Sequence, residues 1–93
     1  MNTFTATFAD GTTITRNSKH AYTVAWRATW NKEGRVVTFT GFSASADKVN
    51  ADKPDLFGVY GSPKQKAEAK RKNAEYRVAC GYRVEIVPAV IAA

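Results

Sequence analysis

The sequence has few of the residues that mark secreted, metal-binding or membrane proteins. It holds one cysteine and one histidine, too few for an internal disulfide or a structural zinc site. No apolar run approaches the roughly 18 residues that a membrane span needs. The N-terminus has no basic leader followed by an apolar stretch, so we expect no signal peptide. These features favour a soluble cytosolic protein.

The length permits one small domain. A chain of 93 residues buries only about 60–65% of the surface that its unfolded form would expose. With 44% apolar and 12% aromatic residues, it has enough material for a core, which argues against disorder. We therefore expect residues 1–93 to form a single domain.

Positive charge is in excess and unevenly distributed. The chain has 14 Lys and Arg against 8 Asp and Glu, a formal net charge of +6. Residues 15–40 and residues 62–80 each carry a local excess of +4, whereas residues 43–61 are slightly acidic. Clustered cations are typical of a protein that meets phosphates or an acidic partner, although many small basic proteins bind neither.

The first 18 residues predict a β-hairpin. Residues 3–8 alternate threonines with Phe4, Ala6 and Phe8, the pattern of a strand with one buried face. A three-residue turn with Gly11 at positive φ would pair Ala6 with Ile14 and keep the apolar residues on one face.

A second hairpin follows. Residues 21–30 alternate clearly, residues 31–34 form a four-residue loop, and residues 35–42 return. This register pairs Trp30 with Arg35 and predicts a cation–π contact between them.

The strongest helix signals come after Ser62. Ser62 is the N-cap, Pro63 fits the first turn, Gln65 completes a capping box, and Gly81 ends a helix that runs to Cys80. Residues 43–52 predict at most a short helix, residues 54–61 a loop, and residues 82–87 a last strand that ends at Pro88. We expect an α+β fold: one antiparallel β-sheet of four to five strands, with the main α-helix packed on one face. The apolar residues of that helix are Ala67, Ala74 and Val78.

Signals of catalysis are nearly absent. Cys80 falls at the C-terminal end of the helix, where the dipole disfavours a thiolate, and His20 lies in a polar loop. The acids are scattered, and no glycine-rich phosphate loop occurs. We therefore predict no catalytic residue, metal, cofactor or small-molecule substrate.

The main helix carries the first candidate binding surface. Lys66, Lys70, Asn73 and Arg77 recur on one stripe without an acid, with Lys66 and Lys70 about 6 Å apart. Lysines near the helix N-terminus oppose its dipole, so an anion there would be attracted by both. The same pattern also suits an ordinary solvated face, with pairs of Glu68 to lysines four residues away.

The second candidate is the predicted loop of residues 15–20, together with Arg27 and Arg35 on the predicted strands. Its side chains are hydrogen-bond donors suited to phosphates or base edges, but a plain strand connection would have similar composition. The cations that we expect to contact a partner or its RNA are Arg16, Lys19, Arg27, Lys64, Lys66, Lys70, Arg71 and Arg77.

Several short motifs resemble those of phage anti-CRISPR proteins directed at the type I-F system. They are Asp10-Gly11-Thr12, Thr15-Arg16-Asn17-Ser18, Ala21-Tyr22-Thr23, Gly41-Phe42-Ser43 and the basic helix after Ser62. The resemblance implies that the partner is the crRNA-guided surveillance complex, which consists of Cas protein subunits and crRNA. It also implies that the protein acts in the host bacterial cytoplasm. It further implies inhibition by contact, which prevents the complex from engaging target DNA.

The charge favours one mode of inhibition over another. A protein of net charge +6 is unsuited to mimic DNA on lysine-rich surfaces, because like charges repel. We expect its cations to reach crRNA or acidic protein surfaces. The alternatives are a free-standing nucleic-acid-binding regulator, an inhibitor of another host defence or transcription enzyme, and a structural subunit of a larger particle.

Overall fold

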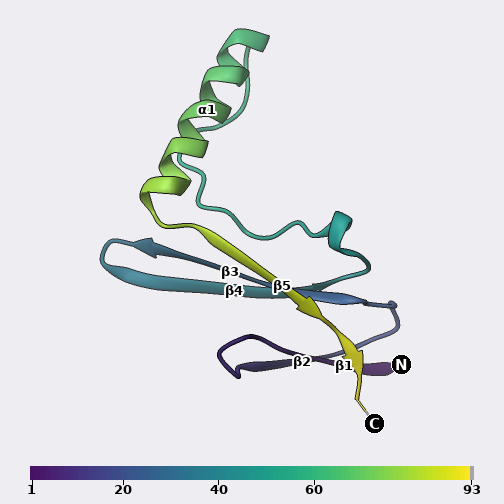
Figure 1. The fold of residues 1–93 in the computed structure, drawn as a ribbon. Helices are drawn as coiled ribbons and strands as arrows, with labels where there is room; N and C mark the ends of the chain where they lie inside the picture. Colours follow the sequence, from purple (N-terminus) through teal and green to yellow (C-terminus); the bar gives the residue numbers. More distant parts are fainter. Residues whose placement is uncertain (93) are drawn as a thin grey trace.

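The computed structural model describes residues 1–92 and has an α+β fold built from two small antiparallel sheets (Figure 1). The elements, in chain order, are β1 (Asn2–Thr7), β2 (Thr13–Ser18), β3 (Val24–Lys32), β4 (Arg35–Ser43), the 3-10 turn η1 (Ala46–Lys48), α1 (Pro63–Ala79), β5 (Arg83–Pro88) and β6 (Val90–Ile91). One sheet has the strand order β2-β1-β6 and the other β4-β3-β5. The predicted class is confirmed, but the single sheet of four to five strands is wrong.

The C-terminal segment joins the two sheets. β5 pairs with β3, and after Pro88 the chain turns so that β6 pairs with β1 through Phe4 and Thr5. Between them, Ala89 donates its N–H to Thr23 O at 2.9 Å. Pro88 predicts the end of a strand but gives no signal of a second one two residues later, which is why the sequence did not separate the sheets.

The core lies on both faces of the β4-β3-β5 sheet. One face packs on the β1–β2 hairpin, and the other is covered by the segment after β4 (Figure 1). The first cluster is Ala6, Phe8 and Ala25 with Ile14, Phe42 and Val87; the second is Trp26, Ala28 and Ala51 with Trp30, Val49 and Tyr82. Within residues 43–52, the predicted short helix is reduced to the single turn η1.

The first hairpin has the predicted register. Ala6 lies opposite Ile14, and Gly11 has φ +90°. β2 is longer than expected, because β1 pairs with it as far as Ser18 and Thr3 Oγ1 donates to Asn17 Oδ1 at 2.6 Å. Residues 15–18 are therefore strand rather than loop.

The second hairpin differs from the prediction by two residues. Its turn is only Glu33-Gly34, both at positive φ (51° and 80°), as a tight two-residue hairpin requires. Lys32 therefore pairs with Arg35, and Trp30 stacks on Phe39 with ring centroids 5.2 Å apart. The predicted contact between Trp30 and Arg35 is wrong, although a shift of two residues leaves every side chain on its expected face.

Helix α1 forms as predicted but packs differently. The reciprocal capping box of Ser62 and Gln65 is present, and Gly81 has φ +69°. Ala67, Ala74 and Val78, expected to dock on a sheet, are exposed, with Val78 at 82%. The helix instead rises from the sheets (Figure 1), and the radius of gyration is 15.8 Å against about 12 Å for a compact chain of this length.

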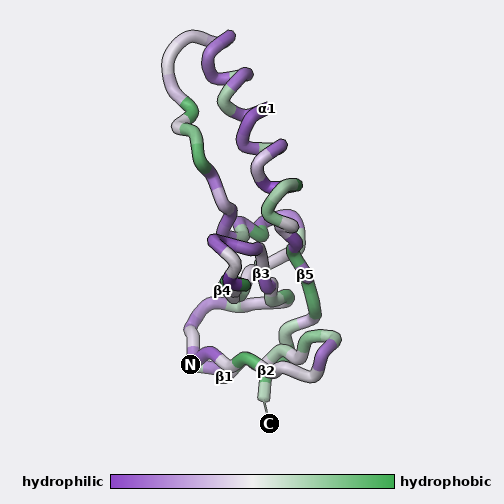
Figure 2. The backbone as a smooth tube through the Cα atoms, turned by 90° about the vertical axis from the view of Figure 1, so that its left-hand side faces the viewer, coloured by the Kyte–Doolittle hydropathy of each residue, from purple (hydrophilic) through white to green (hydrophobic). Residues whose placement is uncertain are grey.

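The side chain of Asn73 joins helix α1 to the segment that precedes it. This side chain is 1% exposed and bonds three backbone groups of the preceding segment, which runs alongside α1 (Figure 2). Asn73 Oδ1 accepts from Leu56 N at 3.1 Å and Phe57 N at 2.9 Å, and Nδ2 donates to Phe57 O at 2.9 Å. Helix and segment thus form one unit, here called the arm (residues 55–80).

Replacing Asn73 with alanine is expected to detach the segment from α1. The change leaves two N–H groups and one carbonyl without partners, a loss of about 1–3 kcal/mol in the free energy of unfolding. Amide exchange at Leu56 and Phe57 should accelerate, and the thermal midpoint should fall. Asn73→Asp keeps an acceptor for both N–H groups but turns a carboxylate oxygen toward Phe57 O at a buried site, so it should also be destabilised. Unchanged exchange at Leu56 and Phe57 in Asn73→Ala would contradict this role.

Candidate polyanion-binding surface

Three lysines on the arm are exposed and have no ion-pair partner within residues 1–92: Lys64, Lys66 and Lys70. The first turn of α1 contains no acidic residue, so the positive end of the helix dipole adds to the field of the two lysines beside it. Lys66 and Lys70 are one turn apart, about 6 Å along the axis. This face can accept a row of negative charges.

The other cations of α1 are paired. Arg71 Nη1 lies 2.9 Å from Glu75 Oε1, and Lys72 Nζ lies 3.4 Å from Glu68 Oε1. Glu68 pairs with Lys72, and among residues 1–92 Lys64 makes no ion pair with Glu68. The Arg71 and Glu75 side chains are 61% and 65% exposed, and such pairs are worth little, so Arg71 remains accessible to a partner.

The predicted four-residue stripe divides into two pairs. Lys66 and Lys70 face solvent, whereas Asn73 and Arg77 turn toward the segment beside the helix. Arg77 forms an ion pair with Asp55. The sequence missed this division because a buried asparagine and a solvated one give the same polar pattern.

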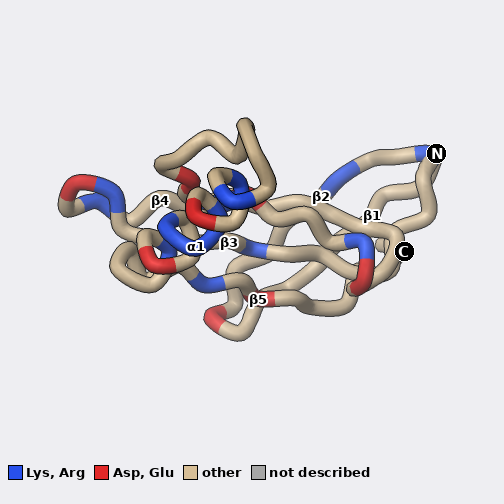
Figure 3. The backbone as a smooth tube through the Cα atoms, turned by 90° about the horizontal axis from the view of Figure 1, so that it is seen from above, with Lys and Arg blue, Asp and Glu red and all other residues tan. Residues whose placement is uncertain are grey.

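Arg16 and Lys19 lie elsewhere in the molecule. Arg16 is on β2, with its guanidinium carbon 5.7 Å from the centroid of the Tyr22 ring, and Lys19 follows the end of that strand. Seen from above, cations fall at α1, at the β3–β4 turn and along β2, with others on β3 and β5 (Figure 3). The structure therefore does not bring Arg16 and Lys19 together with the arm lysines.

Arg27 is engaged within the chain. Its side chain, 16% exposed, donates from Nη1 to Asp10 Oδ2 at 2.9 Å and from Nη2 to Glu85 Oε1 at 2.8 Å. The guanidinium carbon also lies 4.6 Å from the centroid of the Phe8 ring. Arg27 thus cross-links the first hairpin, β3 and β5. No local pattern links residues so distant in sequence as Asp10 and Glu85.

These contacts shift the ionisation of both acids. Hydrogen bonds from the backbone and side chain of Thr12, followed by that from Arg27, lower the pKa of Asp10 to about 2. The pKa of Glu85 is lowered chiefly by the N–H of Ala9, which donates to Oε2 at 2.8 Å, with Arg27 contributing further. The pKa of Arg27 is raised, first through its hydrogen bond to Asp10.

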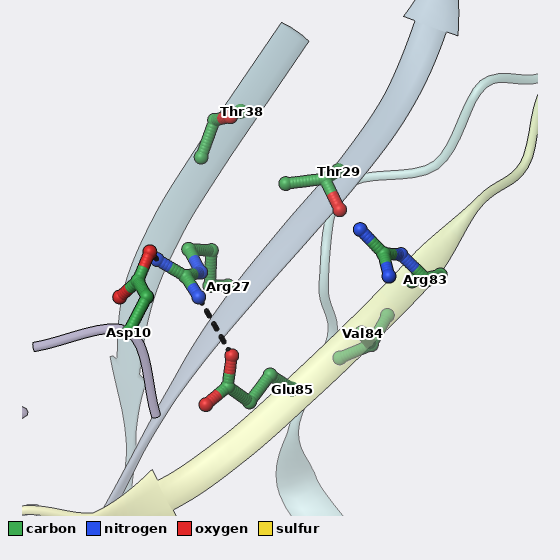
Figure 4. Close-up of a pocket in the computed structure, with 7 residues that line it drawn as sticks. All are labelled: Asp10, Arg27, Thr29, Thr38, Arg83, Val84 and Glu85. Carbon is green, nitrogen blue, oxygen red and sulfur yellow. Dashed lines mark hydrogen bonds and ion pairs between the residues drawn. The ribbon is translucent and has the colours of Figure 1, made fainter. Parts of the chain in front are cut away.

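A polar hollow of about 390 Å³ lies beside this cross-link (Figure 4). It is lined by Asp10, Arg27, Thr29, Thr38, Arg83, Val84 and Glu85. Two arginines face two acids there, so the hollow has no excess of either charge and is a poor anion site. Within the described residues, no group of three or more His, Cys, Asp or Glu side chains could hold a metal ion.

Comparisons with protein families, curated proteins and solved structures found no significant match to this chain. Among residues 1–92, no helix has both the length and the apolar character needed to cross a membrane.

Replacing Arg27 with methionine is expected to raise the pKa of Asp10 part of the way from about 2 toward its ordinary value, because the Thr12 hydrogen bonds remain. The lowered pKa means that Asp10 stabilises the fold above pH 3.8 and that this contribution disappears as the pH falls toward 2. NMR titration of the Asp10 carboxyl carbon measures the shift. Arg35→Met, at the β3–β4 turn, should leave the titration unchanged, and an unshifted Asp10 in Arg27→Met would contradict the contact.

Proposed function

We propose that this chain is a phage anti-CRISPR protein that binds the type I-F crRNA-guided surveillance complex stoichiometrically and prevents its engagement of target DNA. The supporting observation is the arm, a helix held clear of the sheets with Lys64, Lys66 and Lys70 exposed and without an ion-pair partner among the described residues. The protein acts in the host bacterial cytoplasm and needs no catalytic residue.

Shape and charge together support this proposal. The molecule extends over 50 × 30 × 15 Å, so the arm can enter a groove while the sheets stay outside it. Lysines about one helical turn apart suit the phosphates of a nucleic-acid strand, and neutralising phosphates releases counterions. Contact of these lysines with crRNA, or with acidic surfaces of Cas subunits, would obstruct pairing of the guide with DNA.

The contact surface has a core and a periphery. Lys64, Lys66 and Lys70 form the core, and Arg71 contributes from a weak surface pair. Arg16 and Lys19 would make a separate contact through β2. Arg27 and Arg77 act through the fold, because each already pairs with an acid of this chain.

Reversing two arm lysines should weaken binding to the assembled complex. Lys66→Glu with Lys70→Glu places two acids where anions are expected, so affinity should fall by more than about tenfold. Surface plasmon resonance on the immobilised complex at physiological salt measures the change, with naked crRNA as a parallel target. Circular dichroism verifies that the helix is retained.

A matched variant controls for net charge. Lys48→Glu with Lys53→Glu lowers the net charge equally at two exposed lysines outside α1, and it should bind nearly as the parent does. Equal losses of affinity in both double variants would mean that binding depends on net charge and not on the positions of the arm lysines. Binding to naked crRNA alone, weakening steeply with salt, would favour a free-standing nucleic-acid binder.

A further inference from the structure

Strand β4 leaves a long edge open. In the β4-β3-β5 sheet, β4 is an outer strand of nine residues, Arg35–Ser43, and no other strand within residues 1–92 pairs with its outer side. Its sequence, RVVTFTGFS, has one charge, at the first position, and no proline. Natural edge strands are usually shortened or carry charges and prolines that prevent pairing with another chain. β4 lacks these protections over most of its length.

The register identifies the backbone groups that face outward. Asn31 donates its N–H to Cys80 O on the β5 side of β3, so Asn31 and its partner Val36 are not a hydrogen-bonded pair. Hydrogen-bonded and non-hydrogen-bonded pairs alternate along an antiparallel ladder. The N–H and C=O groups of four β4 residues therefore point away from β3: Val36, Thr38, Thr40 and Phe42.

The strand is complementary to itself. When two copies of β4 are placed antiparallel about a two-fold axis at Phe39, Thr38 lies opposite Thr40 and Val36 opposite Phe42. Val36 and Phe39 are 70% and 45% exposed, so this register buries apolar surface that the single chain leaves in water. Cross-strand pairs of aromatic and β-branched residues stabilise a sheet.

Charge is compatible with this arrangement. Arg35, the only charge in β4, falls opposite Ser43 of the other copy, so no cation meets a cation along the strand. Asp47 follows Ser43 by four residues, which places an acid near the same end. An interface that presents the same surface on both copies is the commonest geometry of soluble dimers.

We infer that β4 is a self-association edge, through which two copies of this chain join their β4-β3-β5 sheets into one six-stranded antiparallel sheet. The inference is independent of the proposed function. Because each copy carries a net charge of +6, general repulsion opposes association, and salt should strengthen the dimer by screening it. Polyanion binding responds to salt in the opposite direction.

A proline at Thr38 tests the edge. The Thr38 N–H points outward, so Thr38→Pro removes no hydrogen bond of the single chain but blocks the outer ladder. Sedimentation of the parent chain over micromolar concentrations should show a monomer–dimer equilibrium, with an apparent mass approaching twice that of the monomer. Thr38→Pro should stay monomeric, whereas Thr38→Val should dimerise as the parent does. A parent that stays monomeric over this range, or a folded Thr38→Pro that still dimerises, would overturn the inference.

Cysteine cross-linking tests the register even if the proline variant fails to fold. In a Cys80→Ala background, Phe39→Cys places two thiols opposite each other at a non-hydrogen-bonded pair, where Cα atoms about 4.5 Å apart permit a disulfide. Val36→Cys is the control, because its own counterpart lies about 20 Å away along the strand. Covalent dimers of Phe39→Cys alone support the register. If only Val36→Cys cross-links, or if neither variant does, the proposed pairing is wrong. If the parent is monomeric and Thr38→Pro loses affinity for the surveillance complex, the inference is also wrong, and a strand of that partner occupies the edge instead.

Discussion

The buried side chain of Asn73 is the contact on which the shape of this molecule depends. Helix α1 has no extensive contact with either sheet, and Asn73 is its only buried residue. Its amide satisfies three backbone groups of the segment beside it, groups that would be costly to leave unpaired. Because a polar contact holds the helix, its remaining faces are free, and the lysines stay in solvent.

A second set of polar contacts joins the sheets. The first hairpin packs on the β4-β3-β5 sheet through a small cluster around Phe8, and Arg27 connects its turn to β5 through Asp10 and Glu85. A chain of 93 residues has little apolar surface to bury. Side-chain contacts between elements distant in sequence therefore carry much of the arrangement.

The parts of the fold that depend on neighbouring residues could be predicted. The Ser62–Gln65 capping box, the turn at Gly11 and the alternation of the strands each follow from a short pattern. The predictions were wrong where the structure depends on a contact between distant residues or on an unusual backbone conformation. Glu33 at positive φ shortened the second turn, and Asn73 replaced the expected apolar docking. The basic helix could be found from its charges, but which of them are accessible depended on contacts with Asp55 and Glu68.

The central claim is that the arm lysines form the binding surface, and differential labelling of lysines tests it most directly. The chain would be acetylated briefly, free and saturated with the type I-F surveillance complex, and the modification of each lysine measured by mass spectrometry. We predict that labelling of Lys64, Lys66 and Lys70 falls strongly in the complex while that of Lys48 and Lys53 is nearly unchanged. Undiminished labelling of the three arm lysines in the bound protein would contradict the claim.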